Sequence, residues 1–216
     1  MRVSTRSAYL NGLAAIQQLQ SALDRTQRQI SSGRRILTPS DDPIAASRSL
    51  EIRESLSRLD QFDRNGTIVT NRLSQEESAL NSVNNVLQRV RELAVGALNG
   101  TLSSGDLQSV GVEVRSLLDG LVAVGNTRNA NCEYLFSGYQ TGSVPFTDGG
   151  SGNVTYSGDS GNLHLQIRPT RQLAVADNGA DVFMGVPAAA GGTVSIFDVV
   201  NDFATALAAG NPQSAT

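Results

Sequence analysis

The sequence contains no lysine and no tryptophan, and its 216 residues include a single cysteine and a single histidine. Without lysine, the chain offers no Schiff-base nucleophile and no phosphate-binding P-loop lysine. With only Cys132 it forms no intramolecular disulfide, and one cysteine with one histidine is too few for an ordinary tetrahedral zinc site. These absences exclude several enzyme classes and one whole class of structural metal site.

Aromatic residues make up only 5% of the chain, which favours elongated helix packing over a compact core with large aromatic anchors. The net charge is −3, and the 17 arginines are scattered among 20 acidic residues. No basic field is available to attract nucleic acid or anionic lipid. We therefore expect no nucleic-acid partner. No apolar run approaches the roughly 20 residues that span a bilayer, so we also expect no membrane insertion.

The few residues that could carry chemistry have plainer interpretations. His164 alternates with Leu163 and Leu165, as expected of a solvent-facing strand residue. Cys132 lacks a neighbouring basic group to activate it and is expected to be a small, partly buried residue. Asp41 and Asp42 are explained by helix capping. The segment 148–153 lacks the alternating acids of a calcium loop. We therefore predict no catalytic residue, no metal and no cofactor, and a protein that is not an enzyme.

The first helical segment carries apolar residues at alternating spacings of three and four, which is the pattern of a helix packed against other helices. Its expected end is Ser31-Ser32-Gly33, with glycine as the C-terminal cap. The expected packing residues are Ile16, Leu19, Leu23 and Ile30.

A much longer helix is expected to follow, with Asp42 as its N-cap and Pro43 at its first position. It would cover about 55 residues, several times the average helix length of about 12. Its packing residues are expected to include Leu73, Leu80, Val83, Leu87 and Val90, in a stripe interrupted only by Glu76.

Ser103 is expected to cap a third helix, with Asp106 three residues later completing a capping box. The expected packing residues there are Leu107, Val114, Leu117 and Leu121. Three long helices with short connections predict an antiparallel bundle.

After Tyr134 the apolar period changes to two, which predicts strands. We expect 154–156 and 163–167 to pair as a hairpin across a five-residue connection, and a further helix over 196–209. The fold class is thus mainly α with a small β domain: a long antiparallel helical rod or coiled-coil bundle plus an outer domain that contains a β-hairpin. The expected divisions are 1–40, a coiled-coil segment; 41–140, a rod; 141–195, the β-rich outer domain; and 196–216, the start of a further helix.

Two stretches resemble the bacterial flagellin superfamily. The segments 29–36 (QISSGRRI) and 39–46 (PSDDPIAA) look like its N-terminal signature, a helix that ends in Ser-Ser-Gly before a double Asp opens the long helix. The segment 84–95 (NNVLQRVRELAV), followed by Asn99-Gly100-Thr101, is similar to the middle of that helix and its exit turn. The resemblance covers at least residues 1–140.

Within the superfamily, Asp42-Pro43-Ile44 is typical of the hook-associated branch, whereas flagellins usually continue the double Asp with Ala-Ala-Gly. The segment 126–141 is also similar to that branch, although Cys132 stands where a glycine is expected. The resemblance implies a structural subunit that leaves the cell through the flagellar export apparatus without a cleavable signal peptide. It implies self-assembly into an extracellular ring or layer between hook-associated protein 1 and flagellin.

Two alternative functions remain open: a flagellin filament subunit, and a secreted coiled-coil protein that binds a non-flagellar partner. Members of the superfamily also carry C-terminal helices that return along the N-terminal ones, and such helices do not occur before Thr216. We therefore expect residues 1–36 to be largely disordered in the isolated monomer, because their apolar seam has no partner to cover it.

Replacement of Leu80 or Leu87 by Asp should unfold the rod, because a lone charge would enter a helix interface. The measurement is the thermal midpoint of unfolding, which should fall. An unchanged midpoint would show that these residues lie on the wrong face of the helix.

Overall fold

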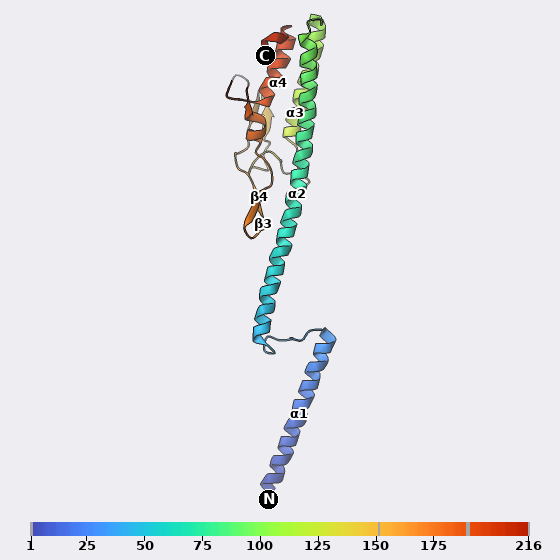
Figure 1. Ribbon diagram of the computed structural model, residues 1–216, viewed down its shortest axis with the longest axis vertical. Coiled ribbons are helices and arrows are strands. Elements are labelled where there is room, and N and C mark those ends of the chain that lie inside the picture. The colour runs from blue at the N-terminus through green and yellow to red at the C-terminus, as the bar shows by residue number, and fades with distance from the viewer. Residues whose placement is uncertain (1, 151, 189–190, 216) are drawn as a thin grey trace. The chain divides into compact units, whose positions relative to one another are not determined.

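The computed structural model describes residues 2–150, 152–188 and 191–215, and it divides into two compact units, Met1–Asp60 and Gln61–Thr216. Each unit is described by itself. Within the described residues, three long helices come first along the chain, followed by three short strand pairs and a fourth helix. Figure 1 shows the course of the chain through these elements. This composition confirms the expected fold class, mainly α with a small β region.

The first unit consists of helix α1 (Arg2–Ser32), a connection, and the beginning of helix α2 (Pro43–Leu98). Gly33 follows α1 with φ of 65°, in the left-handed region that glycine adopts without steric cost. The predicted end of the first helix is therefore confirmed. The predicted length of the second helix is also confirmed, since α2 has 56 residues.

In the second unit the rest of α2 packs with α3 (Ser104–Gly125) and α4 (Ile196–Ala208) around a continuous apolar core. Small residues let α3 and α4 approach closely. A Cβ atom at Gly111 would lie 3.4 Å from the Leu207 Cβ and 3.5 Å from the Ala204 carbonyl oxygen. The buried face of α4, which begins at Ile196, carries no charged residue. Its buried side chains are Phe197, Val200, Phe203, Ala204, Ala206 and Leu207.

In the part of the chain that the structure describes, the strands form three separate antiparallel pairs. Strand β1 (Phe146–Asp148) pairs with β2 (Val154–Tyr156), β3 (His164–Arg168) with β4 (Arg171–Ala174), and β5 (Val186–Pro187) with β6 (Thr193–Val194). A π-helical turn η1 (Ala180–Met184) precedes β5, and a 3₁₀ turn η2 (Pro212–Ala215) follows α4. The expected pairing of 154–156 with 163–167 is wrong.

The physical reason for the different pairing lies in the two turns. Asp148 Oδ1 accepts hydrogen bonds from the backbone N–H groups of Gly150 and Gly152, which closes the loop between β1 and β2. Two residues, Pro169 and Thr170, then connect β3 directly to β4. His164 is exposed on β3, as expected from its alternation with half-buried leucines.

The aromatic residues are few but concentrated. Four of the six phenylalanines, Phe136, Phe146, Phe183 and Phe197, are fully buried against one another, with ring centroids 5.0 to 5.6 Å apart. Beside them, the Tyr156 hydroxyl lies 3.0 Å from the Phe136 carbonyl oxygen and 3.0 Å from Asn178 Oδ1. Burial, with nearby Asp159 and Asp181, raises the pKa of Tyr156 to about 12. The cluster joins the strand region to α3 and α4.

Replacement of Phe183 by Ala should destabilise the second unit by about 3–5 kcal/mol, because it leaves a cavity among three other rings. Chemical denaturation measures the free energy of unfolding. Val112→Ala is the matched control, since Val112 is 70% exposed on α3 and its truncation removes almost no buried surface. Equal effects of the two substitutions would contradict the assignment of the core.

Candidate assembly surfaces

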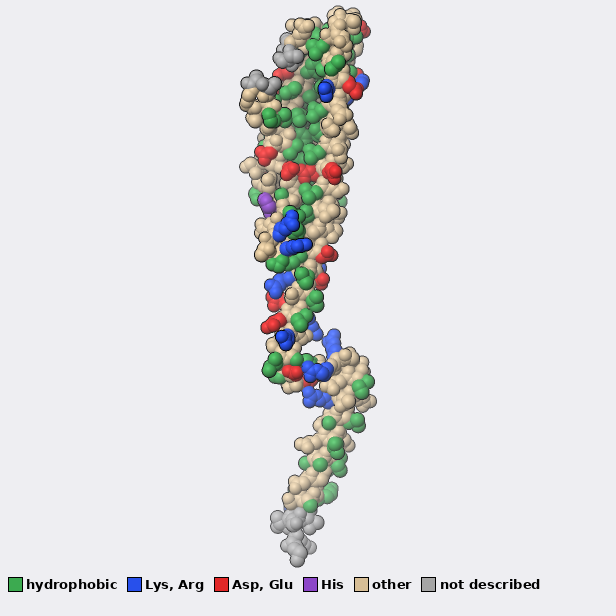
Figure 2. Space-filling view, viewed as in Figure 1, with side chains coloured by type: hydrophobic (Ala, Val, Ile, Leu, Met, Phe, Trp, Pro, Cys, Tyr) green, Lys and Arg blue, Asp and Glu red, His purple; other side chains and the backbone are tan. Residues whose placement is uncertain are grey.

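The first unit presents an apolar face that nothing in the unit covers. Ile16, Leu19, Leu23 and Ile30 are 56%, 71%, 66% and 78% exposed, respectively. Hydrophobic side chains stand on the surface along α1 in the space-filling view (Figure 2). Uncovered apolar surface of this extent is typical of interaction sites in proteins.

The beginning of α2 continues this chemistry within the same unit. Five large aliphatic side chains are more than half exposed there: Ile44, Leu50, Ile52, Leu56 and Leu59. The spacing 52–56–59 places three of them on one side of the helix. The first unit therefore presents two uncovered apolar helix faces and has almost no buried core.

The connection between α1 and α2 is organised by two adjacent aspartates. Asp41 accepts hydrogen bonds from the N–H groups of Leu37 and Thr38 and pairs with Arg25 at 2.9 Å. Asp42 lies at the N-cap of α2, where its Oδ1 accepts from the Ala45 N–H at 3.0 Å. Its other oxygen pairs with Arg35 at 3.2 Å.

These contacts favour the charged form of both carboxyls. Hydrogen bonds from the backbone of Thr38 and Leu37 lower the pKa of Asp41, with a smaller effect of Arg25. The Ala45 N–H, and then Arg35, lower the pKa of Asp42. Sequence reasoning assigned both residues to capping and missed the role of Asp41, which fixes the connection and not the helix end.

In the second unit, the expected packing residues of α2 divide into buried and flanking positions. Val83 is 6% exposed, while Leu80, Leu87 and Val90 are partly buried against the core. Leu73 is 41% exposed and lies outside the core. The buried positions before Ala79 are Val69, Arg72 and Glu76, so Arg72 is buried in place of the expected Leu73 and the stripe there is largely polar.

The expected residues of α3 lie closer to the prediction. Leu107, Val114 and Leu121 are buried, whereas Leu117 is only partly buried and its neighbour Leu118 is 2% exposed. Leu118 belongs to the apolar core that α3 shares with α4. Arg89 of α2 also reaches α3, where its guanidinium donates to Glu113 Oε1 at 2.7 and 2.9 Å.

Ser103 occupies the N-cap of α3. The Asp106 N–H donates to its hydroxyl oxygen at 3.3 Å, and the Ser103 N–H donates to the Asp106 carboxylate at 3.1 Å. This reciprocal pair is a capping box with Asp in the third position. It begins α3 after the short turn that follows α2.

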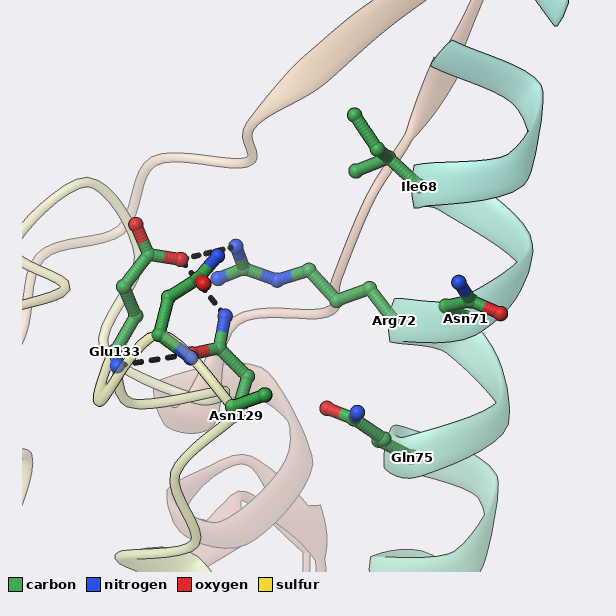
Figure 3. Close-up of a pocket in the computed structure, with 8 residues that line it drawn as sticks. Ile68, Asn71, Arg72, Gln75, Asn129 and Glu133 are labelled. Carbon is green, nitrogen blue, oxygen red and sulfur yellow. Dashed lines mark hydrogen bonds and ion pairs between the residues drawn. The ribbon is translucent and has the colours of Figure 1, made fainter. Parts of the chain in front are cut away.

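A cavity of about 230 Å³ opens between α2 and the loop 129–133 (Figure 3). Arg72 extends across it from α2, and its Nη1 donates to Glu133 Oε2 at 3.2 Å. Asn129 holds the loop, since its Nδ2 donates to Glu133 Oε2 and its Oδ1 accepts from the N–H groups of Asn131 and Glu133. Gln75 and Ile68 border the cavity along α2.

The described residues offer little else for chemistry. Among them, no group of three or more His, Cys, Asp or Glu side chains is placed to hold a metal ion. No helix within the described ranges is long and apolar enough to cross a membrane. Cys132 was expected to be partly buried, which is wrong: it is exposed, with φ of 62°.

Residues 3–141 match the family model described as bacterial flagellin N-terminal helical region. Flagellar hook-associated protein 3 of Escherichia coli strain K12 is 32% identical over 183 residues, which cover 85% of this chain and 57% of that protein. Phase 1 flagellin of Salmonella naestved is 34% identical over 129 residues, 60% of this chain and 26% of the flagellin.

Among solved structures, the flagellar junction protein FlgL from Legionella pneumophila is similar, with 31% identity and a TM-score of 0.59. The match covers 69% of this chain and 45% of that one. The chain thus spans little more than half the length of the curated hook-associated relative that it matches.

The charged forms of Asp41 and Asp42 should support the α1–α2 connection above pH about 4 and cease to do so in acid. Their pKa values in the folded chain lie below the usual 3.8, so the stabilisation is complete above that value and is lost as the pH falls through the folded pKa. Amide NMR shifts of Leu37, Thr38 and Ala45 should report midpoints below about 3.9. In Asp42→Asn the Ala45 shift should no longer titrate, and a midpoint above the usual value would contradict the assignment.

Proposed function

This chain belongs to the bacterial flagellin family, and we propose that it is a structural subunit of the junction between the flagellar hook and filament. The observation that carries the proposal is the uncovered apolar seam of α1 and early α2, together with a second unit that has its own core. A subunit of this kind is folded in one part and acquires the partner for its other part on assembly.

The comparisons support the hook-associated role over the filament role. The similarity to hook-associated protein 3 extends over 183 residues and includes the strand region, whereas the similarity to flagellin covers 129. The proline at position 43, which begins α2 directly after the Asp42 cap, is the feature by which the sequence itself favours that branch.

On assembly, the seam residues of α1 would be covered by helices of the same ring or layer. The proposed neighbours are further copies of this chain, hook-associated protein 1 on the hook side and flagellin on the filament side. The subunit would reach this extracellular site through the flagellar export apparatus. Its function requires no catalytic residue, cofactor or metal, and it rests on helix packing alone.

The test is performed with the complete protein in the source bacterium. Ile16→Asp combined with Leu23→Asp places two charges on the seam, and burial of an unpaired charge is strongly unfavourable. Cells should export this variant but carry no attached filaments, and flagellin should appear as monomer in the medium. Electron microscopy and the protein content of the medium measure both effects.

Asn11→Asp combined with Gln18→Asp is the matched control, because these exposed residues lie on the other side of α1 by its 3.6-residue period. Filaments and swimming should persist in this variant. If deletion of the gene removed the filament and no flagellin appeared in the medium, this chain would itself be the filament subunit. Normal filaments on the seam variant would contradict the assembly role of α1.

A further inference from the structure

Helix α2 changes its chemistry within the second unit. Its buried side chains from Ala79 onward are apolar and belong to the core that includes α3 and α4. Before Ala79, the residues that hold other parts of the unit are polar: Asn65, Arg72 and Glu76. Their spacings of seven and four residues place all three on one face of the helix.

Each of these three side chains binds a different segment beyond the rod. Asn65 Nδ2 donates to the Gln166 carbonyl oxygen on β3 at 2.7 Å. Arg72 Nη1 donates to Glu133 Oε2 at 3.2 Å, across the cavity of Figure 3. Glu76 Oε1 accepts from the Asp177 N–H at 2.9 Å, just after β4. Together they fasten the β3–β4 hairpin and the loop 129–133 to α2.

The segment that they fasten has little apolar anchorage of its own. Leu163, Leu165 and Ile167 are only partly buried, and none of residues 163–174 belongs to the apolar core. Val69 is the buried aliphatic residue that α2 offers in this region. Val175 and Ala176, directly after β4, are 1% and 8% exposed and anchor the end of this segment. The attachment of 163–174 itself therefore depends mainly on hydrogen bonds, each of which contributes only about 0.5–1.5 kcal/mol net.

Two atoms of this arrangement weaken it further. Arg72 Nε and Glu76 Oε2 are buried and have no hydrogen-bond partner, although their residues are only 8% and 3% exposed. A buried polar group without a partner loses its hydration without compensation. Burial also raises the pKa of Glu76, although the Asp177 N–H and Arg72 act against that change. The contacts of this polar face therefore contribute little net free energy to holding the hairpin on α2.

The apolar core begins immediately after Glu76's partner segment. Asn178 is 2% exposed and its Oδ1 lies 3.0 Å from the Tyr156 hydroxyl, while the Gly179 N–H donates to the Phe136 carbonyl oxygen at 3.2 Å. A Cβ atom at Gly179 would lie 2.4 Å from that same oxygen, so the chain is packed tightly there. This point separates the hydrogen-bonded segment from the segment held by aromatic packing.

We propose that Asn65, Arg72 and Glu76 form a clasp that holds the β3–β4 hairpin and the loop 129–133 on α2, and that the clasp opens while the core stays folded. Opening would uncover Val69 between Ile68 and Leu73, which are already 52% and 41% exposed. The apolar face of α2 would then extend beyond the core. The polar contacts of the clasp would break in a separate step from the apolar packing of the core.

Hydrogen exchange under native conditions tests the clasp in the complete chain. In the parent protein, amides of 163–177 should exchange through an opening that leaves 107–121 and 200–207 protected. Arg72→Met and Glu76→Met should each accelerate exchange of 163–177 by about tenfold, with no acceleration in the two core segments. Glu76→Gln keeps an oxygen that accepts from Asp177 and should stay within about threefold of the parent.

Gln75→Ala is the matched control, because Gln75 is an exposed neighbour on α2 without a role in the clasp. It should leave exchange unchanged. Asn65→Ala removes one hydrogen bond at a partly exposed position, so it remains informative even if a buried substitution prevents folding, and it should accelerate exchange at 163–168. Equal acceleration in the clasped and core segments would overturn the proposal, and so would no acceleration in any variant.

Discussion

An apolar stripe on a helix has to be covered by another surface, and this requirement organises both units of the chain. In the second unit α2 meets α3 and α4, and the aromatic cluster closes the space between them and the strands. In the first unit α1 has a comparable stripe but no covering element. Most helix stability in proteins comes from packing of such a face, and the proposed assembly contacts would supply the packing that the first unit lacks.

Apolar periodicity in the sequence was sufficient to predict the helices, and capping residues located their ends. Gly33, Pro43 and Ser103 mark boundaries that depend on local backbone chemistry alone. The strand pairing was not predictable in the same way. Strands of three residues carry almost no periodic signal, and their partners were selected by the Asp148 turn and by tertiary packing of Phe146.

The packing sites were only partly predictable for a related reason. A hydrophobic pattern identifies a helix face but not which half of it a neighbour covers, so Leu118 was missed and Leu73 was overestimated. A buried arginine gives no apolar signal, and Arg72 was therefore invisible in the sequence. Glu76 did give a signal, since it was the one interruption in the stripe, but its partner Asp177 is 101 residues away. At position 132 the resemblance led us to expect a glycine, and the sequence alone offered no reason for it. The structure supplies the reason, because Cys132 has a φ of 62°, in the left-handed region that favours glycine.

The two kinds of fastening differ in energy in a way that fits a subunit folded in one part and assembled through another. Full burial of a single Leu or Ile side chain contributes about 1.5–3 kcal/mol. Burial of the four seam residues of α1 would therefore stabilise more than three hydrogen bonds do, since these must compete with hydrogen bonds to water. Apolar burial is directionless and strong, which suits a contact that must hold a layer of subunits together. Hydrogen bonds fix geometry with little net free energy, which suits the attachment of the β3–β4 hairpin to α2. The clasp can therefore yield under conditions that leave both the core of the second unit and an assembled seam intact.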